Sequence, residues 1–409
     1  MDFNLSEKTK EKRKQVQTFI KDHIEPMEND YYKELHALDN SYTNLPQLDE
    51  LKKKAESEGL WNLFLKEGEK EVSKSTEYAP LAECMGHSFL APEVFNCNAP
   101  DTGNMELLLK YGNDEQKEKW LTPLLRGKTR SAFGMTEPAV ASSDATNMAA
   151  TAILEGDEVV INGTKWWTSG AGHPNLDFII FMGLSLPEGP RHGRHSMVIV
   201  PKGTPGLKIE RMLSVFGYHD EPFGHGEVTF KDVRVPKSHI IGGIGRGFEM
   251  AQGRLGPGRI HHCMRLIGAS ERALSLLCER SLSKVAFGKP LSHLGGNRER
   301  IANARIQIEQ ARLLVYKAAW MIDTVGVKHA MSEVSQIKVV APRLSQEITD
   351  FAIQIHGGGG VCQDFPLAAM FAGARALRLA DGPDEVHLAL VARAELAKYQ
   401  KESREQGNR

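Results

Sequence analysis

FGMTEPAVASSD, which spans Phe133–Asp144, lies between an apparently helical N-terminal part and a run of short strand signals. It combines a rigid Glu-Pro step with several small residues and with hydroxyl groups at Thr136, Ser142 and Ser143. Small residues let the backbone approach a ligand closely, while hydroxyls and backbone N–H groups form hydrogen bonds with it. We therefore expect a flat, polar-edged cofactor to lie against the main chain at this stretch.

The segments on either side of this stretch predict three domains. Before it, apolar residues such as Val16, Phe19 and Ile20 recur at helical spacing. After it, residues 151–154 and 159–161 flank the turn sequence EGDE and predict a β-hairpin, and helical periodicity returns from Gly247. The predicted fold class is α+β, with an N-terminal all-α domain (1–128), a middle β domain (129–238) and a C-terminal helical bundle domain (239–409).

Composition excludes several classes of function. The 409 residues carry 51 Lys plus Arg and 52 Asp plus Glu, a net charge of −1 that argues against a nucleic-acid partner. The five cysteines show no metal-like spacing, which favours reduced thiols, and no apolar run of about 18 residues predicts a membrane span. Adjacent His261 and His262 would diverge on a helix, so we expect no metal there. The predicted compartment is the cytoplasm, or the mitochondrial matrix if a targeting segment has been removed.

A second segment, GTKWWTSGA at Gly163–Ala171, has a similar character. Two adjacent tryptophans precede two hydroxyl residues, and together these side chains could wall a planar ring and bind its edge. Taken alone, the segment is better explained as the end of a strand whose tryptophans fill the core. Together with Phe133–Asp144, the segment indicates a cofactor site much more specifically than either segment does alone.

The two segments, at this spacing and in this order, resemble the flavin-binding segments of the acyl-CoA dehydrogenase family, which carry a TEP motif and a KxW motif. The resemblance covers nearly the whole chain, through DVRVP at 232–236, AFGK at 286–289 and IHGG at 355–358. The runs GRLGPGRIHHCMR (253–265) and RLADGPDEVH (378–387) are similar to vertebrate family members ten and eleven and to their bacterial relatives.

The resemblance implies that the middle domain is a β-barrel and the C-terminal domain a four-helix bundle. It also implies FAD as cofactor and assigns residues to it. Thr136 would lie at the pyrimidine edge, Trp167 would stack on the ring system, and Ser169 would lie near flavin N5. Ser143, or its neighbour Ser142, would lie where cofactor and coenzyme A meet. The residues implied to contact FAD within this part of the chain are Phe133, Met135, Thr136, Ser143, Trp167, Thr168 and Ser169.

The resemblance also implies a base, which the family commonly supplies as a glutamate in a tight turn. Here the matching residue is Asp381, and Gly382 would let the backbone approach the thioester. The local sequence DGPDE is equally typical of a helix start, where Asp384 could provide the cap instead. Arg259 matches an arginine that faces coenzyme A in the family.

A third set of residues implies an oligomer, a dimer or a tetramer. In the family the matching positions hold the FAD of a neighbouring subunit or its adenosine part. They are Lys284, Phe287, Gln354, Gly357, Gly358, Asp384 and Glu385.

The resulting expectation is an acyl-CoA dehydrogenase of fatty-acid oxidation. It would form 2,3-enoyl-CoA, with the α-proton passing to Asp381 and the β-hydride to flavin N5, and would pass electrons to an electron-transfer flavoprotein. Two alternatives stay open, a flavin-dependent oxidase of the acyl-CoA or nitroalkane type and a flavin-bearing binding protein without turnover. The acyl chain's length, branching and hydroxylation are left undetermined.

Overall fold

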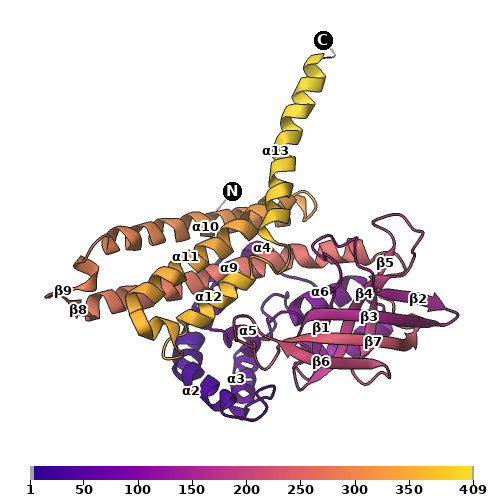
Figure 1. Cartoon of the computed structure of the whole chain (residues 1–409), viewed down its shortest axis with the longest axis horizontal. Coiled ribbons are helices and arrows are strands. Elements are labelled where there is room, and N and C mark those ends of the chain that lie inside the picture. Colours follow the sequence, from indigo (N-terminus) through magenta and orange to yellow (C-terminus); the bar gives the residue numbers. More distant parts are fainter. Residues whose placement is uncertain (1–3, 408–409) are drawn as a thin grey trace. The chain divides into compact units, whose positions relative to one another are not determined.

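A computed structural model describes residues 4–407, which divide into two compact units (Figure 1). The sheet unit comprises Lys21–Ser73 and Pro92–Leu255. The helical unit comprises the chain up to Ile20, Lys74–Ala91 and the chain from Gly256 on. The first helices of the sequence are therefore shared between the units, because α1 (Glu7–Phe19) and α4 (Ser75–Met85) belong to the helical one.

The sheet unit is built on one curled sheet of seven strands in the order β1-β4-β2-β3-β7-β6, with β5 paired to β4. The predicted hairpin at EGDE is present as β2 and β3, which pair antiparallel, whereas β1 and β4 pair in parallel. The path ends at β1 and β6, which are not paired with each other in the described chain, so the sheet is an open half-barrel and not a closed barrel. Its strands are β1 (Arg130–Gly134), β2 (Thr151–Glu155), β3 (Glu158–Ser169), β4 (Leu176–Leu184), β5 (His195–Pro201), β6 (Leu207–Leu213) and β7 (His225–Pro236).

Alternation along these strands explains the core of the sheet unit. Residues such as Ile161, Phe181, Val228 and Phe230 point inward and are almost completely buried together. Short helices complete the unit: α2 (Glu25–His36), α3 (Pro46–Ser57), α5 (Ala91–Val94), α6 (Asp101–Tyr111), α7 (Asp114–Gln116) and α8 (Thr122–Leu125).

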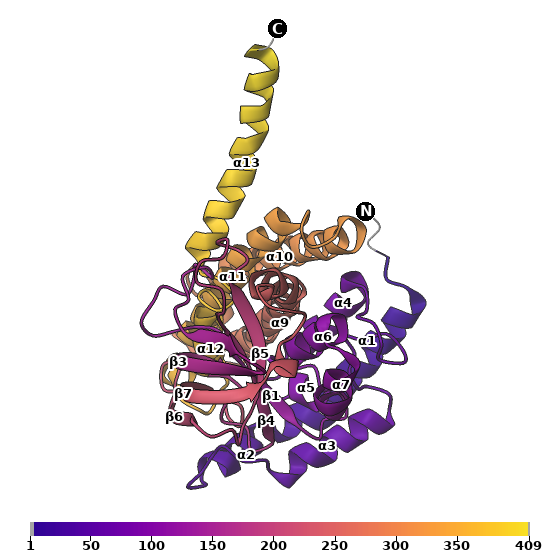
Figure 2. The ribbon, with the colours of Figure 1, turned by 90° about the vertical axis from the view of Figure 1, so that its right-hand side faces the viewer.

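The helical unit contains the long helices that the periodicity predicts. On α11 the predicted stripe of Ile337, Leu344 and Ile348 is buried. The last helix extends away from the others of this unit in two perpendicular views (Figure 1, Figure 2). The helices are α9 (Gly247–Ser283, which begins in the sheet unit), α10 (Asn297–Val325), α11 (Met331–His356), α12 (Leu367–Ala376) and α13 (Asp384–Gly407), with a small β8–β9 hairpin at 285–290.

This arrangement confirms the predicted fold class, an α+β chain with helical parts before and after a β part. None of the helices within the described range is long and apolar enough to cross a membrane.

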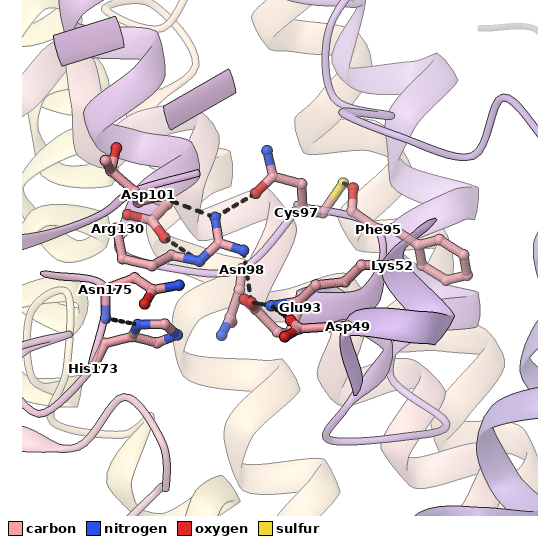
Figure 3. A network of polar contacts seen from close by, with 12 residues as sticks. Asp49, Lys52, Glu93, Phe95, Cys97, Asn98, Asp101, Arg130, His173 and Asn175 are labelled. Carbon is pink, nitrogen blue, oxygen red and sulfur yellow. Dashed lines mark hydrogen bonds and ion pairs between the residues drawn. The ribbon is translucent and has the colours of Figure 1, made fainter. Parts of the chain in front are cut away.

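A buried charge network fixes the start of β1 (Figure 3). Arg130 donates a hydrogen bond to Glu93 at 2.6 Å, and Lys52 forms a second ion pair with the same carboxylate. Asp101 accepts hydrogen bonds from the Ser131 N–H at 2.8 Å and the Ser131 hydroxyl at 2.6 Å. Buried charges are tolerated when they are paired and hydrogen-bonded in this way. The network thus anchors the strand that leads into FGMTEP.

Candidate active site

The two motif segments lie side by side in the sheet unit. The backbone N–H of Trp166 donates to the carbonyl of Thr136 at 3.0 Å, which joins the end of FGMTEP to β3. Trp167 has a left-handed backbone, with φ of +51°, and its side chain is 39% exposed. A large aromatic held in that conformation and left uncovered is typical of a ligand-binding position.

The side chains implied to contact flavin differ in exposure. Phe133, Met135, Thr136 and Ser169 are partly exposed, as a surface that receives a ligand requires. Thr168 is completely buried, and its hydroxyl has no hydrogen-bond partner in the protein. Thr168 therefore presents no exposed atom to a cofactor, unlike its neighbours Trp167 and Ser169.

A buried ion pair joins the two motif segments, whose partly exposed side chains Phe133, Met135, Thr136, Trp167 and Ser169 we call the flavin wall. Lys165 Nζ lies 2.7 Å from a Glu137 carboxylate oxygen and donates to the Met135 carbonyl at 2.9 Å. The same carboxylate accepts the backbone N–H groups of Ala149 and Ala150 at 2.9 and 3.1 Å. Burial lowers the pKa of Lys165 to about 8 although Glu137 opposes that shift. The charged residues of both motifs are thus structural, and sequence reasoning assigned them no role.

The structure separates Ser142 from Ser143. The Ser142 hydroxyl accepts the backbone N–H of Glu137 at 2.9 Å and so closes the loop on itself. Ser143 is exposed. Of the two, Ser143 is the residue whose side chain is available to a ligand.

Arg254 is a further residue of the wall that sequence reasoning missed. Its guanidinium lies 4.0 Å from the centre of the Phe133 ring, within the range of a cation–π contact. Asn104 joins it to the strand, because it accepts from Arg254 Nε at 3.2 Å and donates to the Ser131 hydroxyl at 2.8 Å. No local motif marks Arg254, since the contact depends on how α9 meets β1.

Asp381 lies in a strained turn of the helical unit. Its φ is +56° and that of Gly382 is +103°, both in the region that L side chains rarely adopt. Its carbonyl oxygen lies 3.1 Å from Arg259 Nε and 3.2 Å from His387 Nε2. Ser335 Oγ lies 3.1 Å from the other nitrogen of His387. These contacts fix the backbone on which the Asp381 carboxylate is mounted.

The histidine in this turn is neutral. Burial, followed by the nearby charge of Arg259, lowers the pKa of His387 to about 4. A neutral ring that donates from Nε2 to Asp381 must accept at Nδ1, which the Ser335 hydroxyl satisfies. His262 is on the carboxylate side, with Nε2 3.5 Å from Asp381 Oδ2, and both side chains are 23% exposed.

Arg259 combines a structural contact with an unsatisfied donor. Its side chain is 6% exposed, and burial lowers its pKa although the charge of Asp381 opposes that shift. Nε binds the Asp381 carbonyl, whereas Nη1 has no hydrogen-bond partner in the protein. A buried guanidinium with one donor unused is suited to a ligand carbonyl or anion.

Asp384, expected either to cap a helix or to contact FAD, is occupied by two arginines in the structure. Its buried carboxylate binds Arg343 Nε and Arg378 Nε, each at 2.9 Å. Glu385, the next residue, is exposed. Asp384 is therefore the aspartate of this turn that Arg343 and Arg378 bind.

The remaining predicted cofactor residues lie at the β8–β9 hairpin and at the glycine turn that follows α11, two elements of the helical unit drawn in Figure 1. Phe287 is 95% exposed beside the β8–β9 hairpin, and Lys284 and Gln354 are exposed as well. Arg280 donates to the carbonyl of His356 at 3.5 Å, which links the end of α9 to the glycine turn that contains Gly357 and Gly358. From Arg259 to Ser283, α9 is about 36 Å long at about 1.5 Å per residue.

Comparisons with known proteins agree with this geometry. Three family models match: "Acyl-CoA dehydrogenase, N-terminal domain" at residues 6–128, "middle domain" at 132–233 and "C-terminal domain" at 245–396. Together they cover most of the chain.

Several curated relatives are similar over most of this chain. "Acyl-CoA dehydrogenase family member 11" of Gallus gallus is 54% identical over 96% of this chain, and "Acyl-CoA dehydrogenase family member 10" of Mus musculus is 52% identical over 96%. The chain spans only 51% and 37% of those two proteins. "Probable acyl-CoA dehydrogenase FadE2" of Mycobacterium tuberculosis is 50% identical over 97% of this chain and 98% of its own length.

Solved structures similar to this chain include other acyl-CoA dehydrogenases. A Mycobacterium abscessus structure described as an acyl-CoA dehydrogenase has a TM-score of 0.94 and 59% identity, covering 97% of this chain and 100% of its own. Butyryl-CoA dehydrogenase of Megasphaera elsdenii has a TM-score of 0.81 and 27% identity over the same shares. This chain therefore belongs to the acyl-CoA dehydrogenase family.

Proposed function

We propose that this chain dehydrogenates acyl-CoA thioesters to trans-2,3-enoyl-CoA and passes the electrons to an electron-transfer flavoprotein. The observation that carries the proposal is the turn at Asp381. Arg259 and His387 hold its backbone carbonyl, while Arg343 and Arg378 neutralise Asp384 instead. A carboxylate mounted on a fixed, strained backbone is suited to act as a base.

FAD fits the wall of the sheet unit. Trp167, Phe133 and Met135 are at least partly exposed and offer apolar surface to a planar ring. Thr136 and Ser169 offer hydroxyls to its edge. Bound there, FAD supplies the acceptor for the β-hydride. The Lys165–Glu137 pair keeps the two motif segments together, so that the wall is formed before the cofactor arrives.

Residues of this chain remove the α-proton and bind the substrate. The Asp381 carboxylate removes the α-proton, and the backbone N–H of Asp381 donates to the thioester oxygen as negative charge develops on it. Gly382 leaves room for the thioester beside that backbone. Ser143 and the unused Nη1 of Arg259 bind the coenzyme A side of the substrate.

A homo-oligomer, at least a dimer, completes the FAD site. Lys284, Phe287, Gln354 and Gly357 lie near one end of α9, about 36 Å from the Arg259 end that holds Asp381. A single FAD molecule is shorter than that separation. We infer that these residues, together with Gly358, serve the FAD of a neighbouring subunit, where the exposed Lys284 binds the pyrophosphate and the exposed Phe287 is covered. Glu385, beside Asp381 in the chain, is assigned to the adenosine part of FAD.

Anaerobic titration with acyl-CoAs of increasing length, followed by flavin bleaching, tests the proposal. We expect wild type to bleach with at least one chain length, and Asp381→Asn to bind FAD but bleach at least a hundredfold more slowly. Asp350→Asn, an exposed aspartate of α11, is the matched control and should behave as wild type. Normal bleaching in Asp381→Asn would rule out the assigned base. Rapid reoxidation of the bleached enzyme by air would identify an oxidase instead.

A further inference from the structure

One face of α11 supports the turn that carries Asp381. Ser335 and Lys338, three residues apart and so on the same side of the helix, are both buried. Ser335 Oγ contacts His387, which in turn binds the Asp381 carbonyl. Lys338 is 1% exposed, and its Nζ donates to the carbonyl of Leu377 at 2.5 Å. None of the roles proposed above uses this lysine.

Leu377 is the residue at which the segment containing Asp381 starts. It caps the C-terminus of α12, where the last carbonyl groups have no partners within the helix and the helix dipole favours a cation. Four residues later, the Asp381 carbonyl accepts a hydrogen bond from Arg259 Nε. Buried cationic side chains, Lys338 and Arg259, thus hold both ends of residues 377–381.

Lys338 also lies close enough to Asp381 for their charges to interact. The thiol of Cys263 donates to the carbonyl of Ile337, the residue before Lys338, at 3.5 Å and joins α9 to this part of α11. Burial lowers the pKa of Lys338 from its ordinary value, and the charges of Asp381 and Asp384 oppose that shift. The neighbouring carboxylates therefore favour the ammonium form of this lysine.

The other ionisable groups that face this turn lie on α9, α11 and α13 and after α12. Burial raises the pKa of the Cys263 thiol to about 12 and lowers that of the His387 imidazole to about 4, so both are uncharged at neutral pH. A histidine such as His262, 3.5 Å from Asp381 Oδ2, can change charge between about pH 5 and 8, and the test has to separate it. The groups are Arg259, His262 and Cys263 on α9, Arg343 on α11, Arg378 after α12, and Asp384 and His387 on α13.

We propose that Lys338 is a positioning residue for the base: it holds the end of α12 from which the Asp381 turn starts, and its buried charge favours the ionised carboxylate of Asp381. The proposal rests on the proposed function, in which Asp381 removes the α-proton. It gives the lysine two separable contributions, a tether made by its hydrogen bond to Leu377 and a field made by its charge.

The two contributions affect the rate of flavin reduction differently. A positive charge beside a carboxyl group lowers its pKa, so that more of the base is ionised on the acid side. Loss of the charge should raise the pKa of Asp381 and slow the reaction only at pH values below it. Loss of the tether should displace the carboxylate and slow the reaction at every pH.

The pH profile of flavin reduction at saturating acyl-CoA, measured anaerobically from about pH 5.5 to 9, tests both contributions. Lys338→Gln keeps a hydrogen-bond donor but loses the charge, whereas Lys338→Met loses both. Both should move the acid limb up by about one pH unit, which makes reduction about tenfold slower below that limb. On the alkaline side, Lys338→Gln should reach the rate of wild type, and Lys338→Met should stay slower.

Two controls assign the shift to this lysine. Lys317→Gln, which removes an exposed lysine of α10 that lies 3.5 Å from Glu333, should keep the profile of wild type. In a His262→Gln background, Lys338→Gln should again move the acid limb by about one pH unit. A shift that disappeared without His262 would assign the limb to the histidine and overturn the proposal.

A double-mutant cycle measures the same interaction without using activity. Urea unfolding at pH 7 of the FAD-bound protein compares wild type, Asp381→Asn, Lys338→Gln and the double variant. A shift of one pH unit corresponds to a tenfold change in the unfolding equilibrium, about 1.4 kcal/mol. The loss of stability in Asp381→Asn should therefore be about tenfold larger with Lys338 present than in the Lys338→Gln background.

The outcomes distinguish the role of Lys338 from the proposed function. The same acid limb in wild type and Lys338→Gln, or a cycle without coupling, would overturn the role of Lys338 even if acyl-CoA bleaches the flavin of wild type normally. Tenfold coupling in a protein whose flavin no acyl-CoA bleaches would support the interaction of Lys338 with Asp381 and overturn the dehydrogenase. Methionine and glutamine are both close to lysine in volume, so the comparison does not depend on one variant alone.

Discussion

Replacing Lys165 with methionine isolates a buried carboxylate beneath the proposed flavin wall. Lys165 and Glu137 are both buried, and their side chains meet at 2.7 Å. Without the ammonium group, the Glu137 carboxylate keeps only the backbone N–H groups of Ala149 and Ala150. Methionine fills most of the lysine volume, so the loss is electrostatic and leaves no large cavity.

The two halves of the pair are expected to differ in their effect on stability. Lys165→Met should lower the free energy of unfolding by about 3–5 kcal/mol, the range for a buried charge left without its partner. Glu137→Gln should lower it by less. In Glu137→Gln, Lys165 can lose its proton and so avoid being a buried charge without a partner. Because the pKa of Lys165 in wild type is about 8, this deprotonation costs at most about 1.4 kcal/mol at pH 7. One weakened hydrogen bond adds about 1 kcal/mol.

Urea unfolding at pH 7, followed by circular dichroism and by FAD release, measures these differences. The double variant Lys165→Met/Glu137→Gln should be more stable than Lys165→Met alone, because no charge is left buried. Lys208→Met, which removes a lysine from an exposed pair with Glu210 on β6, is the matched control and should change stability by less than about 1 kcal/mol. Equal losses in the two single variants, or additive losses in the double variant, would refute the reasoning.

Two further changes probe backbone strain and a buried acid. Gly382 has φ of +103°, and a Cβ added there would lie 2.8 Å from His387 Nε2. Gly382→Ala should therefore displace Asp381 and slow flavin reduction by acyl-CoA at least tenfold. The control is Gly326→Ala, where φ is +83° and no atom lies within 4 Å of the added Cβ, and it should leave that rate unchanged. Burial raises the pKa of Glu106 to about 8 from 4.5, so the folded wild type binds the extra proton and loses stability as pH rises between those values. In urea unfolding, the gain in stability of Glu106→Gln over wild type should therefore grow by about 1.4 kcal/mol per pH unit from pH 5 to 8, and a gain that did not change with pH would contradict this.

The sequence predicted elements whose signals are local. The hairpin of β2 and β3 follows from apolar alternation around a four-residue turn, and the long helices follow from their buried stripes. Strand β6 (Leu207–Leu213) was not predicted. It lies at the edge of the sheet with most of its residues at least partly exposed, so the alternation that marks a buried face is weak there.

Site residues could be predicted from the sequence only where a single segment contains the whole motif. The choice between Asp381 and Asp384 as structural residue depends on Arg343, which lies 41 residues away in the chain and binds Asp384. Likewise, nothing near Ser169 in the sequence marks His225 as its neighbour, because the pairing of β3 with β7 brings them together across 56 residues. Such contacts depend on register and packing, which a linear pattern does not contain.

The flavin motifs contain two kinds of residue, and the structure assigns them to different tasks. In TEP and KWWTS, Glu137 and Lys165 are buried against each other, whereas Thr136, Trp167 and Ser169 are left on the surface that the ion pair supports. Changes at the first pair should therefore act through stability and FAD retention, and changes at the second group through the chemistry of a stable enzyme. A variant such as Ser169→Ala that altered the potential without altering urea unfolding would separate the two tasks within one motif.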